Sequence, residues 1–180
     1  MHSSFPSEIR SAIENDRDLT FAELLDLDSR LELKELMRVS RHLADVGYGD
    51  TITYSPKVFI PLTRLCRDVC HYCTFATVPR HVESPYMQIE EILELCRKGA
   101  ETECREALFT LGERPEARYS AARDTLEKMG FSSTLEYVSF VAGRVLEETG
   151  LLPHINAGCM DFNEIAQLRS VSASMGIMLE

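Results

Sequence analysis

Three cysteines stand close together in the chain, Cys66, Cys70 and Cys73, within the stretch LCRDVCHYCTF. They follow directly on the apolar run of residues 58–62. Soft thiolates at such close spacing select zinc, copper(I) or an iron–sulfur cluster. The stretch therefore predicts a metal centre, and the other cysteines help to decide which one.

Zinc and an iron–sulfur cluster are the two metal centres that need weighing. His71 could complete a Cys3His zinc site, which is a common structural arrangement. Zinc ligands, however, usually come as two short pairs separated by a longer loop. Here the remaining cysteines, Cys96, Cys104 and Cys159, are isolated from one another. The spacing favours the cluster, and a zinc-stabilised binding module stays open as the alternative.

Three thiolates on a four-iron cluster leave one iron without a protein ligand. Such an iron can chelate the amino and carboxylate groups of S-adenosylmethionine. An electron from the reduced cluster then breaks the carbon–sulfur bond and yields a 5′-deoxyadenosyl radical. In such enzymes the cofactors carry the hard chemistry, while the protein supplies ligands and orientation. We therefore assign no catalytic side chain beyond the cluster ligands.

Composition places the chain among ordinary soluble globular proteins. Its 180 residues are 44% hydrophobic and 27% charged. A net charge of −10 argues against nucleic acid or an anionic membrane as a partner. The N-terminal residues MHSSFPSE contain neither a basic nor an apolar signal region. Six cysteines with a clustered trio suit a reducing compartment, so we expect a cytoplasmic protein.

The first 50 residues are predicted to form a polar helical extension, separate from residues 51–180. Thr20 and Glu23 have the spacing of a capping box. Leucine and other apolar residues then recur at helical spacing from Leu33 until Gly47 and Gly49 interrupt them.

From residue 57 the pattern alternates between strands and helices. The predicted strands are residues 58–62, 107–111, 151–157 and 174–179. The predicted helices are residues 88–100, 116–129 and 134–148, with a short one that begins after Asp161. Such alternation predicts parallel βα units with right-handed crossovers. The expected fold class is α/β, a partial TIM-type barrel truncated after about four strands.

In a β/α barrel the reacting groups gather where the strands end. The cysteine loop leaves the end of the first strand, and Gly112 and Glu113 leave the end of the second. His154 and Asn156 share one face of the third strand, and Glu180 ends the fourth. We expect Asn156 and Glu180 to point into the mouth of the barrel, and His154 to line the cavity or form a polar pair.

The three cysteines together with Tyr72 match the CxxxCx(aromatic)C pattern of the radical S-adenosylmethionine superfamily. Gly112 and Glu113 resemble its strand-two Gly-Gly-Glu motif, with Leu111 in place of the first glycine. Glu180 resembles the acidic residue of strand four that accepts hydrogen bonds from the ribose. The resemblance implies a [4Fe-4S] cluster held by the three cysteines.

The same resemblance implies S-adenosyl-L-methionine as the second cofactor. Its contacts would be Tyr72, Gly112, Glu113, Asn156 and Glu180. Cys96 and Cys104 are interpreted as small apolar residues, and Cys159 receives no role. The stretch of residues 114–118 is interpreted as a solvated loop.

A narrower resemblance, to the deazaflavin-forming synthases, covers residues 54–66, 106–115, 151–158 and 171–180. This resemblance implies cyclisation of a hydroxybenzyl–ribitylaminouracil adduct into the deazaflavin of coenzyme factor 420, with loss of ammonia. An adduct-forming radical enzyme, separate or fused, and a reductant such as ferredoxin or flavodoxin would be its partners. The adduct-forming enzymes, menaquinone-pathway enzymes and biotin-synthase-like proteins are the alternatives within the superfamily.

Enzymes of this resemblance use about six βα units, so we expect a fragment. Alone it would make no product, and the edge of its fourth strand would associate with other copies.

Overall fold

A computed structural model describes residues 6–15 and 17–177. The chain divides into two compact units, Met1–Tyr54 and Ser55–Glu180. No helix in the described part is long and apolar enough to cross a membrane.

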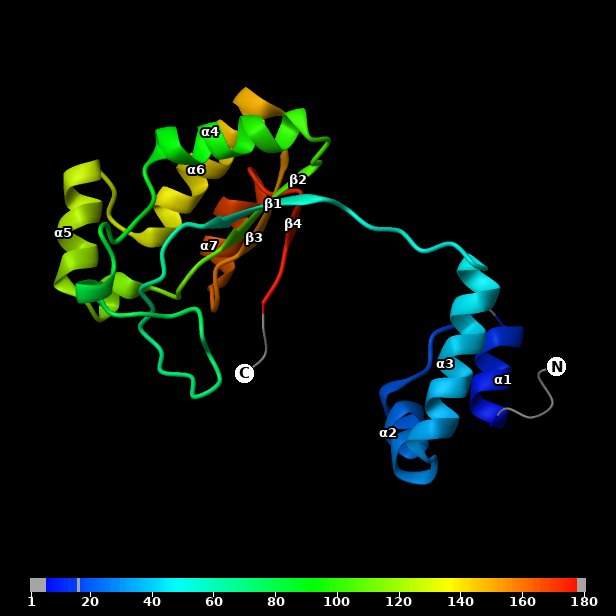
Figure 1. Cartoon of the computed structure of the whole chain (residues 1–180). Coiled ribbons are helices and arrows are strands. Elements are labelled where there is room, and N and C mark those ends of the chain that lie inside the picture. Colours follow the sequence, from blue (N-terminus) through cyan, green and yellow to red (C-terminus); the bar gives the residue numbers. More distant parts are fainter. Residues whose placement is uncertain (1–5, 16, 178–180) are drawn as a thin grey trace. The chain divides into compact units, whose positions relative to one another are not determined.

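The first unit consists of three helices, α1 (Ser7–Glu14), α2 (Phe21–Arg30) and α3 (Leu33–Tyr48) (Figure 1). Ile9, Leu27 and Val39 contribute one buried side chain from each helix to a small core. The prediction of a helical N-terminal segment is confirmed over these ranges.

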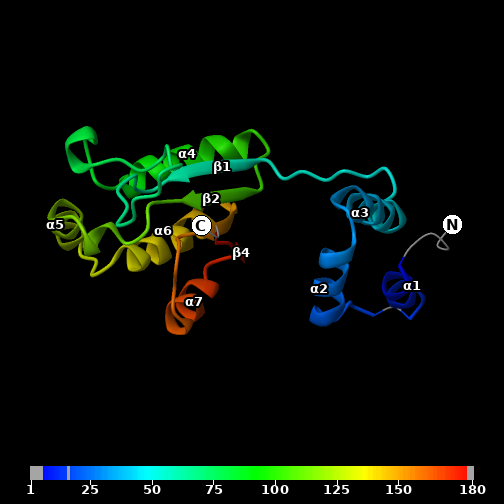
Figure 2. The ribbon, with the colours of Figure 1, turned by 90° about the horizontal axis from the view of Figure 1, so that it is seen from below.

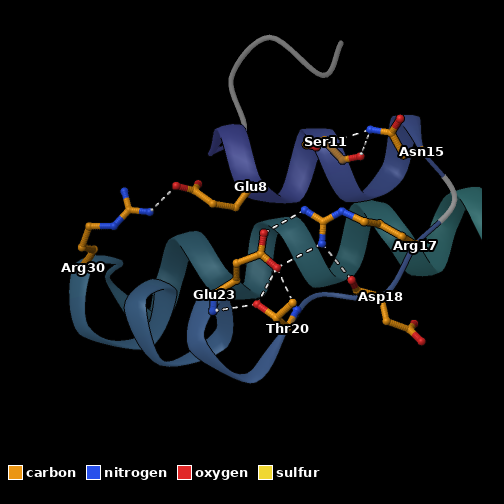
Figure 3. A network of polar contacts seen from close by, with 8 residues as sticks. All are labelled: Glu8, Ser11, Asn15, Arg17, Asp18, Thr20, Glu23 and Arg30. Atoms are coloured by element: carbon orange, nitrogen blue, oxygen red, sulfur yellow. Dashed lines mark hydrogen bonds and ion pairs between the residues drawn. The ribbon is translucent and has the colours of Figure 1, made fainter.

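The capping box predicted at the start of α2 is present (Figure 3). The Thr20 hydroxyl accepts a hydrogen bond from the Glu23 amide at 3.3 Å, and Glu23 accepts one from the Thr20 amide at 2.8 Å. Arg17 donates to both carboxylate oxygens of Glu23, at 2.8 and 3.0 Å. These hydrogen bonds, that from Arg17 foremost, lower the pKa of Glu23 to about 2.

The second unit is built on a parallel sheet in the order β1-β2-β3-β4 (Figures 1 and 2). The strands are β1 (Lys57–Pro61), β2 (Glu106–Thr110), β3 (Leu152–Asn156) and β4 (Ser174–Met175). Ile60, Phe109, Ile155 and Met175 form one row across all four strands. The predicted α/β class with parallel strands is therefore confirmed.

Helices cover one face of this sheet. They are α4 (Ile89–Glu101), α6 (Thr134–Thr149) and α7 (Phe162–Arg169), while α5 (Ser120–Met129) packs on the short 3-10 helix η3 (Pro115–Ala117). Figure 1 shows α4 and α6 side by side along the sheet. Ile60, Phe109 and Ile155 are fully buried against this layer. Their neighbours on the other face, such as Phe59, are half exposed.

Two predictions change in the structure. The predicted helix 116–129 is divided, because Tyr119 has an extended backbone and α5 begins only at Ser120. The fourth strand pairs only over Ser174–Met175, opposite His154 and Ile155, and residues 176–177 are not in a strand. The part of the predicted strand from Met178 onward lies outside the described residues.

A buried polar group joins the start of α6 to the loop before α4. Thr134 donates its hydroxyl to Glu116 at 2.6 Å, and Tyr86 lies 2.6 Å from the same hydroxyl. Glu116 also accepts the amide of Thr134 at 3.0 Å. Tyr86 and Thr134 are each 1% exposed. Burial raises the pKa of Tyr86 above its ordinary value, so its hydroxyl stays protonated and available as a donor.

Replacing Thr134 by Val should lower the free energy of unfolding by about 1–3 kcal/mol, because it leaves the buried Tyr86 hydroxyl without its partner. Urea denaturation measures the change. Thr102→Val is the control, since the exposed Thr102 hydroxyl bonds only to carbonyls at the end of α4. An equal loss in both variants would contradict the argument.

Replacing Arg17 by Gln should raise the pKa of Glu23 from about 2 toward its ordinary value of 4.5. Because the folded pKa is the lower one, Glu23 stabilises the fold fully above pH 4.5 and loses this effect as the pH falls toward 2. An NMR titration of the Glu23 carboxyl carbon tests the pKa. Arg41→Gln, which removes the partner of Asp45 instead, should leave it unchanged.

Candidate metal and cofactor site

Three loops meet at the carboxyl edge of the sheet, as expected for consecutive parallel strands. The cysteine loop follows β1, Gly112 and Glu113 follow β2, and Gly158 and Cys159 follow β3. Together they line a cavity of about 770 Å³.

The cavity collects most of the residues that were predicted as cofactor contacts. Its lining includes Cys66, Cys70, Cys73, Tyr72, Gly112, Glu113 and Asn156. Val69, Phe75, Leu111 and Ile177 add apolar walls. His154 is not in the lining, and its ring nitrogen Nδ1 lies 2.7 Å from the Ser174 hydroxyl. Glu180 lies outside the described residues, so its role stays a prediction.

The cysteine loop carries the donor set of a thiolate-bound metal centre. Cys66 and Cys73 are free thiols. The sulfur of Cys66 accepts the amide of Glu113 at 3.2 Å, and that of Cys73 accepts the amide of Ala76 at 3.4 Å. Amide donors of this kind stabilise negative charge on sulfur and tune iron–sulfur clusters. By residue type and by the cavity beside it, the loop therefore fits a cluster.

The sulfurs themselves are not gathered around one point. Within residues 6–15 and 17–177, no three His, Cys, Asp or Glu side chains lie close enough together to hold a metal ion. The ligand assignment of the three cysteines consequently remains a prediction.

The cysteine loop and the loop after β2 touch through their backbones. Gly112 donates its amide to the carbonyl of Thr63 at 2.9 Å, and Arg67 donates its amide to the carbonyl of Glu113 at 2.8 Å. A Cβ atom on Gly112 would lie 2.0 Å from the carbonyl oxygen of Leu65. Only glycine therefore permits this approach.

The Glu113 carboxylate ties this pair of loops to the third. One oxygen pairs with the guanidinium of Arg67, and the other accepts the amide of Cys159 at 3.0 Å. Gly158 has a φ of +81°, and a Cβ there would lie 2.3 Å from the Glu113 carboxylate. Besides its predicted contact with a cofactor, Glu113 therefore has a second role that the sequence did not show: its carboxylate connects the loops around the cavity.

Two further arginines bind the loops, which corrects the interpretation of residues 114–118 as merely solvated. Arg114 donates to the carbonyl of Cys159 at 3.1 Å and to Glu164 at 2.6 Å. This guanidinium lowers the pKa of Glu164, which also caps the start of α7. Arg118 donates to the carbonyl of Arg67 at 3.2 Å.

Cys96 and Cys104 lie away from this cavity. Cys96 is fully buried on α4, and burial raises the pKa of its thiol to about 11. A thiol that resists ionisation is inert as a metal ligand at neutral pH. This environment agrees with its interpretation as a small apolar residue.

The chain has close relatives among known proteins, and it aligns with only part of the length of each. No family model matches the chain. It is 59% identical over 133 residues to the FO synthase of Mycobacterium tuberculosis, covering 72% of this chain and 16% of that protein. It is 46% identical over 192 residues to the FO synthase of Nocardia farcinica, covering 97% of this chain and 22% of that protein.

A third relative is the 7,8-didemethyl-8-hydroxy-5-deazariboflavin synthase of Methanopyrus kandleri. It is 50% identical over 129 residues, which cover 72% of this chain and 39% of that protein. The chain thus spans well under half the length of each of these relatives.

Two solved structures share the fold at low sequence identity. Methylornithine synthase (PylB) has a TM-score of 0.57 at 21% identity, over 94% of this chain and 46% of that one. The FeFe-hydrogenase maturase HydG of Carboxydothermus hydrogenoformans has a TM-score of 0.59 at 17% identity, over 94% of this chain and 37% of that one. The four parallel strands match part of these two structures, which places the chain in the same α/β fold class. By sequence, the chain is a homologue of FO synthase and deazariboflavin synthase, corresponding to a small N-terminal part of these proteins.

Replacing Gly112 by Ala should lower the free energy of unfolding by about 1–3 kcal/mol, because the new Cβ cannot fit against the Leu65 carbonyl. Gly143→Ala is the matched control, since its Cβ would meet only Val171 at 3.6 Å, an ordinary contact. Chemical denaturation of both variants measures the difference. Equal stabilities would show that the two loops do not approach as described.

Proposed function

We propose that this chain forms the cluster-binding and S-adenosylmethionine-binding part of a radical enzyme of the FO synthase type. Cys66, Cys70 and Cys73 would hold a [4Fe-4S] cluster. The observation that carries the proposal is that these cysteines share one cavity with Gly112 and Glu113, in a homologue of FO synthase. When bound, the cluster and S-adenosylmethionine would supply a 5′-deoxyadenosyl radical.

The residues of the chain have separate parts in this proposal. The amides of Glu113 and Ala76 stabilise charge on two cysteine sulfurs. Tyr72 and Asn156 both line the cavity and would contact S-adenosylmethionine. Val69, Phe75 and Ile177 add apolar surface to the lining beside the proposed cofactors. Glu180 would bind the ribose, as its place in the sequence predicts.

The substrate class comes from the relatives. The whole protein would act on a hydroxybenzyl–ribitylaminouracil adduct and release ammonia as the deazaflavin ring forms. An adduct-forming radical enzyme would supply this substrate, and a ferredoxin or flavodoxin in the cytoplasm would reduce the cluster. The relatives named FO synthase and deazariboflavin synthase support this substrate over that of the adduct-former.

Anaerobic reconstitution with iron and sulfide tests the cofactor assignment. We expect a brown chromophore and release of 5′-deoxyadenosine after reduction with S-adenosylmethionine. Changing any one of Cys66, Cys70 or Cys73 to Ala should abolish this cleavage, because two thiolates cannot hold the cluster with one defined open iron. Cys96→Ala and Cys104→Ala are the controls and should retain the iron. Stoichiometric zinc without the chromophore would refute the assignment, as would equal loss of iron in Cys96→Ala.

Substrate choice is tested separately in a protein that includes the rest of the barrel. Release of 5′-deoxyadenosine should be faster with the adduct than with free tyrosine. Efficient turnover of free tyrosine with ribitylaminouracil, with no partner present, would instead assign the adduct-forming reaction.

A further inference from the structure

Glu113 holds both sides of the cavity at once. Through its backbone amide it bonds the sulfur of Cys66 at 3.2 Å, and through its carboxylate it bonds the amide of Cys159 at 3.0 Å. The carboxylate also pairs with Arg67, the residue that follows Cys66. A shift of Glu113 would therefore move the first cysteine and the opposite loop together.

The environment of the carboxylate makes this link strong. The Glu113 side chain is only 12% exposed, and its two oxygens take different partners. Charge-assisted hydrogen bonds of this kind are roughly twice as strong as neutral ones. Arg118 and Arg114 fix the two partners further, through the carbonyls of Arg67 and Cys159.

Gly158 places the backbone of the third loop directly beside this carboxylate. Its φ of +81° is a conformation that favours glycine, and a Cβ there would meet the Glu113 side chain at 2.3 Å. The loop after β3 thus lies in close contact with the Glu113 side chain.

We propose that Glu113 is a positioning residue whose carboxylate sets the separation between the cysteine loop and the loop of Gly158 and Cys159, and so the width of the cofactor cavity. This inference rests on the proposed function of that cavity. The carboxylate acts through Arg67 and Cys159 and is not itself required to touch S-adenosylmethionine.

The first experiment needs no cofactor. Hydrogen exchange of the Cys159 amide is measured by NMR in the unloaded chain and in Glu113→Ala. We expect exchange at least about tenfold faster in the variant, since the amide loses its charged acceptor. Glu148→Ala is the matched control, because Glu148 is ion-paired with Arg144 and Arg97 outside the cavity. Unchanged exchange in Glu113→Ala would overturn the proposal.

The second experiment uses the reconstituted chain. Glu113→Gln preserves the shape of the side chain and an acceptor for Cys159 but removes the charge that pairs with Arg67. We expect it to retain iron, to bind S-adenosylmethionine about tenfold or more weakly, and to alter the change in the cluster's EPR signal on binding. Arg67→Gln should have the same effect, and the double variant should be no worse than either single one, since coupled residues are not additive.

The outcomes separate the two proposals. If Glu113→Gln is less stable but shows unchanged affinity and EPR signal, the role is merely structural and the positioning proposal is overturned. If the unsubstituted chain binds no cluster, the proposed function fails. The hydrogen-exchange rate of the Cys159 amide in Glu113→Ala then still supports or overturns the link between the loops.

Discussion

The close approach of Gly112 to the carbonyl of Leu65 is the constraint on which the rest of the site depends. It is possible only because β1 and β2 pair in parallel with Pro61 opposite Thr110, so that both strands end at the same level. The amide of Glu113 then reaches the sulfur of Cys66, and the carbonyl of Glu113 reaches the amide of Arg67. A side chain at position 112 would separate these groups, and this wall of the cavity would no longer be held in its present position.

Polar contacts and apolar packing together hold the loops of the cavity. Leu62 and Leu65 after β1, Leu111 after β2 and Ala157 after β3 are buried in the hydrophobic core. The hydrophobic core lies on the helix-covered face of the sheet, where it fixes the strands. At the strand ends, Arg67, Arg114 and Arg118 each bind a carboxylate or a carbonyl of another loop. The apolar core therefore fixes the strands and the beginnings of the loops, and the charged groups add contacts between the loops.

Much of this fold could be predicted because its signals are local in sequence. The capping boxes at Thr20 and Asp161 and the left-handed glycines that end α5 and α6 all depend on neighbouring residues. The predicted helix over 116–129 ends at Met129 as expected but was wrong at its start, where Tyr119 is extended and α5 begins at Ser120. Pro115 gave no signal against this start, because proline is tolerated in the first turn of a helix, where its missing amide would have no intrahelical partner.

The ion pairs of the site could not be predicted in this way. Glu113 and Arg67 are 46 residues apart, and Arg114 and Glu164 are 50 apart. No short spacing rule connects such residues, so Glu113 appeared only as a motif residue and Arg114 as part of a loop. The positions of the cysteines on one loop, by contrast, followed from their spacing and from the strand before them.

The parallel pairing of β1 with β2 also has a consequence for how the chain folds. The residues of β1 pair with residues of β2 that follow about fifty positions later, because α4 lies between the two strands. Pairings of this long range form slowly. During that interval the cysteine loop has neither the Glu113 amide beside it nor the second wall of the cavity. Until β2 is in place, the sulfur of Cys66 therefore lacks the hydrogen bond that it accepts in the folded chain.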